Sequence, residues 1–298
     1  MAEVYGSAVL DRIFAAVLLA VHPAVAPDTS VLDRPAPPAL SYPSEVSAGP
    51  FSPGLTAQAY ISINLRNGVV VYAKEPHQQR PIASLTKIMT GLLAAEQGNL
   101  AVPIRVPRAA TLVEPTRDDL VAGGRYTRRM LLNSALMISA NDSAYTLGYD
   151  LGGGSMQRFY GLMNHAAADL GMADTRYASA NGLDDKVNHS SANDQAIVAW
   201  YALGNPVFRK VVSTRKKRVR WVAPTNVKEY RNHNRMLFGF RGTYGVKTGY
   251  TTAAGACLVV AVRRGNRDVL GVLLGAKNIW SDMPRLIDAT LSRLPATG

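Results

Sequence analysis

The chain has very few residues of the kinds that bind metals or form disulfides. It contains a single cysteine, Cys257, and five histidines scattered over 298 residues. One cysteine excludes intrachain disulfides and cysteine-based metal sites, and there is no His-Glu-x-x-His spacing or other ligand cluster. We therefore predict no metal and no cofactor, so the chemistry must come from ordinary side chains.

The sequence also lacks a long hydrophobic run and a phosphate-binding fingerprint. The apolar stretch at residues 13–21 is too short to span a bilayer comfortably, which takes about 20 apolar residues. The glycine loop at residues 152–154 belongs to neither a Gly-x-Gly-x-x-Gly nor a Walker pattern. These absences argue against a spanning helix in this stretch and against nucleotide chemistry.

The N-terminal region instead has features of an exported protein. Arg12 precedes the apolar stretch, and Ala-Val-Ala at residues 24–26 is a small-x-small cleavage pattern. We predict a signal peptide over residues 1–26, with a packed N-terminal helix as the alternative. Residues 27–57 are rich in Pro, Ser and Ala, which predicts a disordered linker.

Composition and charge describe a globular protein with an anionic environment. The chain is 47% hydrophobic and 18% charged, which suits one large domain or two small ones. The formal net charge of +12 indicates anionic surroundings, such as nucleic acid, a membrane surface or an anionic cell wall, without naming the partner. The basic stretch at residues 215–220 alternates partially and predicts a strand of an exposed hairpin. We expect no specific nucleic-acid binding, because no nucleic-acid module accompanies this stretch.

Hydrophobic periodicity predicts mixed α and β structure. Two β-rich runs flank Asn67-Gly68 and predict a hairpin, and a second hairpin is predicted at residues 256–262 and 269–274. The apolar runs of the second hairpin are continuous, which indicates strands buried on both faces. Helices are predicted in the segments whose apolar residues recur at helical spacing, at residues 81–93, 128–138, 156–170, 193–203 and 283–294.

The first of these helices carries a candidate nucleophile at its start. Ser84 and Lys87 are three residues apart and share one surface of the helix, so a hydroxyl lies beside an amine. Burial and the positive end of the helix dipole would lower the pKa of the lysine, and free N–H groups at the helix start would stabilise an oxyanion. A second Ser-x-x-Lys at residues 213–216 lies in a basic run where nothing would bury its lysine.

Two further segments contain candidate polar residues, but each is weak alone. Ser-Ala-Asn at residues 139–141 follows a predicted helix and reads most simply as a C-cap and turn, and similar triplets recur at 179–181 and 191–193. Lys247 lies on a predicted strand, where the period of two puts Lys247 and Gly249 on one face and Thr248 on the other. Gly249 leaves room for another element to approach.

In chain order, residues 84–87, 139–141 and 247–249 resemble the three motifs of the serine penicillin-recognising enzymes. Their order selects the Ser-x-x-Lys at 84–87, because no Ser-x-Asn lies between residues 213–216 and the Lys-Thr-Gly. Longer matches make the chain similar to the low-molecular-mass D-alanyl-D-alanine carboxypeptidases over roughly residues 57–292. These matches are at residues 81–90, 181–184, 189–191, 232–237 and 245–251.

The resemblance implies a β-lactamase-like α/β (α+β) fold. An antiparallel five-stranded sheet flanked by helices, plus an all-helical subdomain, would form the domain over residues 58–294, with a cleft between the two parts. Residues 295–298 would be a tail. The last five residues, Leu-Pro-Ala-Thr-Gly, are similar to a sortase sorting signal, but no hydrophobic or basic end follows. True wall anchoring, a chance match and an engineered or truncated end all stay open.

The resemblance also implies a role for each motif residue. Ser84 would attack the carbonyl of a D-Ala-D-Ala bond in a peptidoglycan stem peptide, and Lys87 would take its proton. Ser139 would relay a proton to the leaving amine, and Asn141 would orient Lys87 and the substrate amide. Lys247 would supply positive potential, and Thr248 would bind the terminal carboxylate. Substrate binding would include Gly249 and Tyr250, and the N–H groups of Ser84 and Tyr250 would form the oxyanion hole. β-Lactams would acylate the same serine, outside the cytoplasm.

Three alternatives compete with this interpretation. A DD-endopeptidase acting on cross-links would use the same acyl-enzyme. A class A β-lactamase shares the motifs, but it needs a glutamate in a Glu-x-x-x-Asn loop between the second and third motifs, where this chain has only Glu229. The third alternative is a non-catalytic module that binds the wall or a polyanion regardless of Ser84.

Overall fold

A five-stranded antiparallel sheet is the centre of the protein. The computed structural model describes residues 32–43, 54–97, 99–183 and 187–295. The sheet has the strand order β2-β1-β9-β8-β7, so the C-terminal hairpin returns to pair with the N-terminal one. Both hairpins predicted from sequence are confirmed. The strands are β1 (Ala59–Asn64), β2 (Val70–Lys74), β7 (Thr243–Thr251), β8 (Gly255–Arg264) and β9 (Arg267–Ala276).

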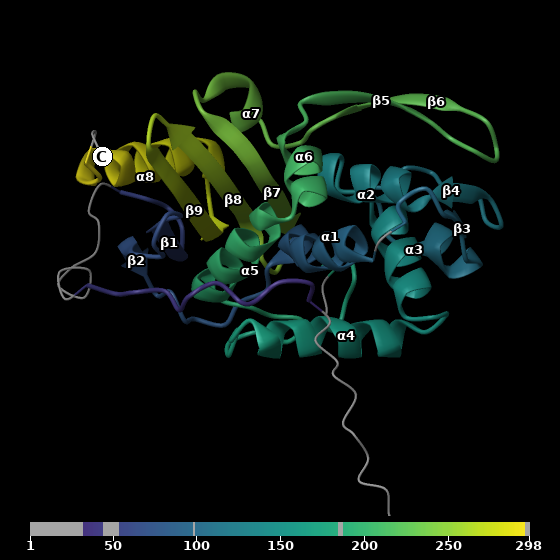
Figure 1. The fold of residues 1–298 in the computed structure, drawn as a ribbon, viewed down its shortest axis with the longest axis horizontal. Helices are drawn as coiled ribbons and strands as arrows, with labels where there is room; N and C mark the ends of the chain where they lie inside the picture. Colours follow the sequence, from purple (N-terminus) through teal and green to yellow (C-terminus); the bar gives the residue numbers. More distant parts are fainter. Residues whose placement is uncertain (1–31, 44–53, 98, 184–186, 296–298) are drawn as a thin grey trace, which may run out of the picture.

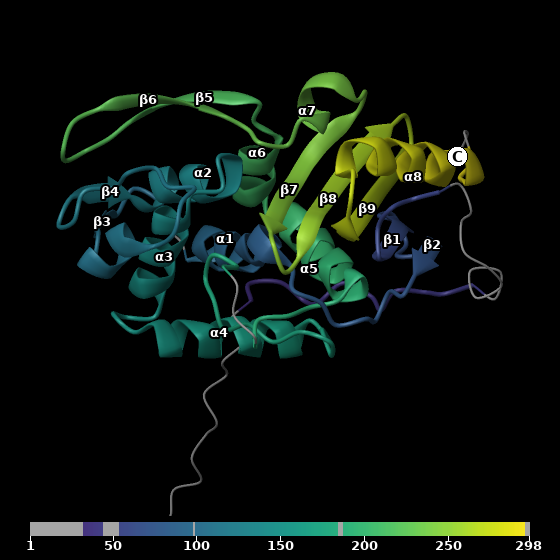
Figure 2. The same cartoon turned by 180° about the vertical axis from the view of Figure 1, so that it is seen from behind.

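Helices cover both faces of this sheet, as its continuous apolar runs predict. On β8, Leu258 and Val260 belong to the hydrophobic cluster under α8 (Ile279–Arg293), whereas Val259 belongs to the larger cluster on the opposite face. Helix α5 (Ala192–Gly204) packs on that opposite face against β1 and β9. Figures 1 and 2 show α8 on one side of the sheet and α1 (Lys87–Glu96) with α5 on the other.

A second part of the molecule consists mainly of helices. It also carries two small sheets, which the expected all-helical subdomain did not include. The β5–β6 hairpin extends over α2 toward β4 (Figure 1), and its turn residue Ala223 pairs with Arg125. The elements are α1 (Lys87–Glu96), α2 (Arg128–Met137), α3 (Asn141–Leu151), α4 (Met156–Asp169), α6 (Pro206–Ser213), the short α7 (Met236–Gly239), β3 (Pro103–Arg105), β4 (Arg125–Thr127), β5 (Lys216–Arg220), β6 (Val227–Arg231) and the 3-10 turns η2 (Ala83–Thr86) and η3 (Arg108–Leu112).

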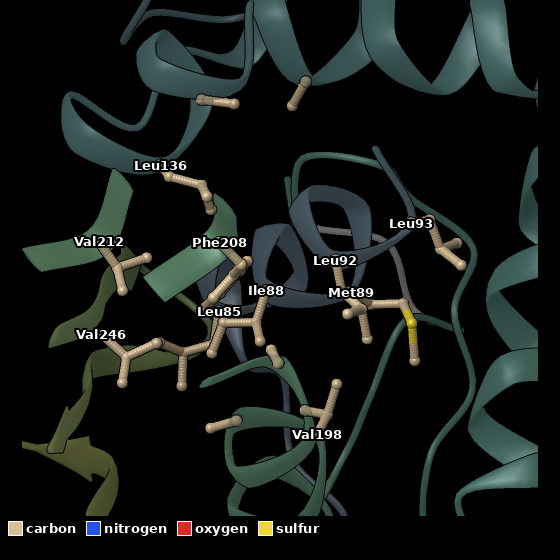
Figure 3. Close-up of a cluster of buried hydrophobic side chains, with 14 of the residues drawn as sticks. Leu85, Ile88, Met89, Leu92, Leu93, Leu136, Val198, Phe208, Val212 and Val246 are labelled. Atoms are coloured by element: carbon tan, nitrogen blue, oxygen red, sulfur yellow. The ribbon is translucent and has the colours of Figure 1, made fainter. Parts of the chain in front are cut away.

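Helix α1 joins the two parts through its apolar side chains. Leu85, Ile88 and Leu92 are fully buried and lie among residues from several elements. Figure 3 shows them surrounded by Phe208 of α6 and Val246 of β7, together with Leu136 and Val198 from α2 and α5. The buried stripe predicted from periodicity therefore anchors the start of α1 where the sheet meets the helices. The α-helix itself begins at Lys87, and Ser84 lies in the preceding 3-10 turn.

The segment 32–43 differs from the expected disordered linker. Ser41 exchanges backbone hydrogen bonds with Gly68 and Val70, and Arg34 donates to the carbonyl of Tyr201 at 2.8 Å. These contacts tie the segment to the domain, although most of its residues are exposed or half-buried. Residues 27–31 and 44–53 of the predicted linker lie outside the described residues. The predicted signal peptide at 1–26 and the end of the sortase-like tail at 296–298 lie outside the described residues. Within the described part of the chain, no helix is both long and apolar enough to cross a bilayer.

Candidate active site

Ser84 lies where three backbone segments approach each other closely. Ala83 before it has a left-handed backbone, with φ +48°, an arrangement that is strained for a residue with a side chain. A Cβ added at Gly182 would be 1.8 Å from the Ala83 carbonyl oxygen, and one added at Gly249 would be 3.1 Å from the Ser84 nitrogen. Glycine at these two positions therefore allows the 179–183 turn and β7 to close around Ser84.

Lys87 makes three short polar contacts although it is fully buried. Its Nζ lies 2.8 Å from Ser84 Oγ, 2.7 Å from Asn141 Oδ1 and 2.6 Å from the carbonyl oxygen of Asn181. Its exposed fraction is 0%, and burial, reinforced by the positive charge of Lys247, lowers its pKa well below the ordinary value. A neutral amine has two N–H groups for the two carbonyl oxygens, which leaves its lone pair for the hydroxyl proton of Ser84.

Ser139 and Asn141 join this network from the junction of α2 and α3. Asn141 is the first residue of α3, and its Nδ2 donates to the carbonyl of Pro115 at 2.8 Å. The amide is thereby oriented with its oxygen toward Lys87. Ser139 has a left-handed backbone, with φ +64°, and it is buried. The C-cap and turn expected at 139–141 is thus a sharp bend between two helices.

Lys247 reaches Ser139 from the edge strand β7. Its Nζ donates to Ser139 Oγ at 2.9 Å and to the carbonyl of Thr248 at 2.8 Å. Burial lowers the pKa of Lys247 to about 7. Thr248 pairs with Leu258 and Lys247 with Val259, so the two side chains leave β7 on opposite faces, as the period of two predicts.

These residues border one cleft of about 1010 Å³. Of the eight site residues predicted from sequence, five line it: Ser84, Ser139, Thr248, Gly249 and Tyr250. Tyr250 is 72% exposed at the rim. The other three, Lys87, Asn141 and Lys247, lie beneath it and contact the lining hydroxyl groups directly or through Lys87. The structure therefore brings all eight together.

Several residues of the cleft were not found from sequence. The Asn181 carbonyl is a backbone group, and its only sequence signal was the Asn-Gly turn that the resemblance matched. The segment 231–235 contributes Arg231, His233 and Arg235 to the lining. It is held by backbone and side-chain bonds that no local pattern reveals: His233 N–H donates to Met137 O, and Asn234 Nδ2 donates to Gly245 O, both at 2.9 Å.

The arrangement suits acyl transfer without a metal ion. The half-buried Ser84 hydroxyl and the buried Lys87 amine could act as a nucleophile and its base, and the Ser84 turn lies close to the backbone of β7. Lys247, which contacts Ser139, and Thr248, which lines the cleft, could offer positive charge and a hydroxyl to an anionic group. In the described part of the chain, no three His, Cys, Asp or Glu side chains are grouped as metal ligands.

Comparison with known proteins agrees with this chemistry. The family model described as D-alanyl-D-alanine carboxypeptidase, peptidase S11, matches residues 46–278. A D-alanyl-D-alanine carboxypeptidase of Streptomyces sp. (strain K15) is 31% identical over 242 residues, which cover 76% of this chain and 83% of that protein. One from Mycobacterium tuberculosis is 30% identical over 240 residues, 78% of this chain and 81% of the relative.

Two further matches broaden the set of activities among the relatives. A D-alanyl-D-alanine endopeptidase of Escherichia coli is 29% identical over 233 residues, 75% of this chain and 73% of that protein. The crystal structure of the Streptomyces K15 DD-transpeptidase superposes with a TM-score of 0.77 at 29% identity, covering 81% of this chain and 99% of that one. The chain therefore belongs to the D-alanyl-D-alanine carboxypeptidase family, peptidase S11.

Proposed function

We propose that this enzyme removes the terminal D-Ala from peptidoglycan stem pentapeptides through an acyl-enzyme on Ser84. The observation that carries the proposal is the position of the Lys87 amine. It lies 2.8 Å from Ser84 Oγ, with both N–H groups directed to carbonyl oxygens and a pKa lowered by burial. A base within hydrogen-bond reach of a hydroxyl, and neutral at working pH, is what activation of that hydroxyl requires.

In the first half of the reaction, Lys87 takes the proton of Ser84 as Oγ attacks the penultimate D-Ala carbonyl. The oxyanion is held by the N–H groups of Ser84 and Tyr250. As the C–N bond breaks, Ser139 passes a proton to the leaving amine, helped by Lys247 at 2.9 Å. Thr248 and the positive charge of Lys247 bind the terminal carboxylate. Water then hydrolyses the ester, with Lys87 again as base, and frees Ser84.

Mass spectrometry of a pentapeptide ending in D-Ala-D-Ala tests this function. The wild-type enzyme should release one D-Ala per peptide, and Ser84→Ala should release none. Ser213→Ala is the matched control, because Ser213 belongs to the other Ser-x-x-Lys and lies at the end of α6. Equal release by wild type and Ser84→Ala would remove Ser84 from the mechanism, and undiminished binding without release would favour the non-catalytic module.

Penicillin should form a long-lived adduct on this enzyme. Between Asn141 and Lys247 the only glutamate in the sequence is Glu229, and it lies on the exposed face of β6 with Lys216 as partner at 3.4 Å. That position is on a strand, away from the loop where a class A β-lactamase places its general base. Rapid release of penicilloic acid would reverse this assignment.

We further propose that the enzyme works outside the cytoplasm, against the anionic wall or membrane surface. The sequence carries 33 basic and 21 acidic side chains, and the outward face of the β5 strand presents Lys216, Arg218 and Arg220. Such a surface attracts polyanions at low ionic strength. Sedimentation with isolated walls should weaken steeply between about 50 and 200 mM salt. Salt-independent retention would contradict the charge-based contact.

A further inference from the structure

The cleft has more positive charge on one side than a single D-Ala requires. Three of its lining residues are cationic: Arg231, Arg235 and Lys277. None of the described residues that line it is Asp or Glu, and no ion pair of these three cations is found within the described ranges. His233 adds no charge near neutral pH, since partial burial, Lys247 and Lys87 lower its pKa to about 4.

The two arginines are held in place by neighbouring rings. The guanidinium of Arg231 lies 4.5 Å from the ring centroid of Phe238, and that of Arg235 lies 5.4 Å from the ring centroid of Trp280. Phe238 and Trp280 also line the cleft. Stacking on an aromatic face orients a guanidinium while leaving its N–H groups available to an anion.

These cations lie on the side of the cleft that receives the leaving half of the substrate. Segment 231–235 is hydrogen-bonded to Met137, just before Ser139, and to Gly245 on β7. Thr248 pairs with Leu258, whose side chain packs under α8, so Thr248 is on the same face as Trp280, and both line the cleft together with Lys277. In the proposed mechanism, Ser139 protonates the leaving amine and Thr248 binds the carboxylate next to it.

We propose that the enzyme prefers leaving groups with a second carboxylate, and that Arg231 and Arg235 determine this specificity. The inference rests on the proposed function. D-Ala offers one carboxylate to three cations, Arg231, Arg235 and Lys277. An acidic peptide joined through its amine to D-Ala, as in a cross-link, would bring further carboxylates to these cations. Cleavage would follow the same path: the ester to Ser84 forms, the C–N bond breaks, and the amine leaves with a proton.

A pair of isosteric substrates tests this preference. One stem-like peptide ends in D-Ala-D-Glu, whose leaving residue has two carboxylates, and the other ends in D-Ala-D-Gln, whose leaving residue has one. We expect kcat/KM for the D-Glu peptide to be about fivefold to tenfold higher, as for a charge-assisted hydrogen bond on an exposed rim. This ratio should fall toward 1 in Arg231→Gln/Arg235→Gln, and in wild type it should shrink with added salt.

Arg218→Gln is the matched control, since Arg218 is an exposed arginine of the same β5–β6 hairpin that does not line the cleft. It should keep the wild-type ratio. Equal kcat/KM for the two peptides in wild type would overturn the inference, and so would an equal loss on both peptides in the double variant. Hydrolysis of the D-Ala-D-Ala peptide alone, with neither the D-Glu nor the D-Gln peptide cleaved, would also overturn it while leaving the proposed function intact. Failure to release D-Ala from any peptide would instead refute the proposed function.

Discussion

Because Lys247 is buried, the free energy of unfolding of the enzyme should rise with pH above neutrality. The side chain is 1% exposed, and burial lowers its pKa from 10.5 to about 7. Below about pH 7 the amine of Lys247 is protonated in both the folded and the unfolded state. The free energy of unfolding is then reduced by the full cost of burying this positive charge. Between about pH 7 and 10.5 the unfolded state binds more protons, and the free energy of unfolding rises with pH. Above this range both states are neutral.

The size of the effect follows from the same pKa values. At about 1.4 kcal/mol per pKa unit, the whole shift corresponds to a cost of about 5 kcal/mol at low pH. From pH 6 to 9 the part of this cost that is relieved is about 3 kcal/mol. Lys247→Met removes the titrating group, and the lost bonds to Ser139 and Thr248 add an offset that is independent of pH.

Urea unfolding of wild type and Lys247→Met at pH 6, 7, 8 and 9 measures this difference. The free energy of unfolding of wild type should rise relative to that of the variant by about 3 kcal/mol over this range. Lys247 also lowers the pKa of Lys87, so the titration of Lys87 contributes to the pH dependence. The double variant Lys87→Met/Lys247→Met, compared with Lys247→Met, measures that contribution. Lys210→Met, a change at an exposed lysine of α6, serves as the surface control. Parallel pH profiles for wild type and Lys247→Met would refute the reasoning.

Two more predictions concern the surroundings of Ser84. Because burial lowers the pKa of Lys87 well below its ordinary value, the rate of acylation by penicillin should stop rising well before pH 10, and stopped-flow rates that rise tenfold per pH unit up to about pH 10 would contradict this. Gly182→Ala would put a methyl group 1.8 Å from the Ala83 carbonyl oxygen at φ +79°, so we expect it to lower the free energy of unfolding by more than about 2 kcal/mol and to slow acylation. Gly161→Ala, at an uncrowded position in α4, should instead stabilise by up to about 1 kcal/mol in the same denaturation assay. Equal effects of the two substitutions would mean that the close approach at Gly182 does not matter.

Local patterns predicted the elements with strong periodicity. The alternating and continuous apolar runs gave both hairpins of the sheet, and the i, i+3, i+4 spacing of Leu85, Ile88 and Met89 gave the buried stripe at the start of α1. The helix α3 was missed, because Asn141 and Asp142 favour turns as well as helix starts. Neighbouring residues alone do not distinguish the two.

The site was predictable only as separate segments. The helical spacing predicted Ser84 and Lys87 together, since they lie on one surface of the helix. It does not predict the contacts of Lys87 with Asn141 or of Lys247 with Ser139, because these residues are 54 and 108 positions apart in the sequence. Only the resemblance joined these segments before the structure was known. The resemblance matched residues 181–184 and 232–237 but gave no role to the Asn181 carbonyl or to Arg231 and Arg235, because the placement of these groups depends on tertiary hydrogen bonds.

The position of a covalent penicillin adduct tests the central claim most directly. The enzyme would be incubated with benzylpenicillin and digested, and the modified peptide would be located by mass spectrometry, with Ser84→Ala and Lys87→Ala in parallel. We predict the adduct on Ser84, no adduct in Ser84→Ala, and formation slowed by about 10²–10⁴-fold in Lys87→Ala. An adduct on Ser139 or Ser213, or full modification of Ser84→Ala, would contradict the account.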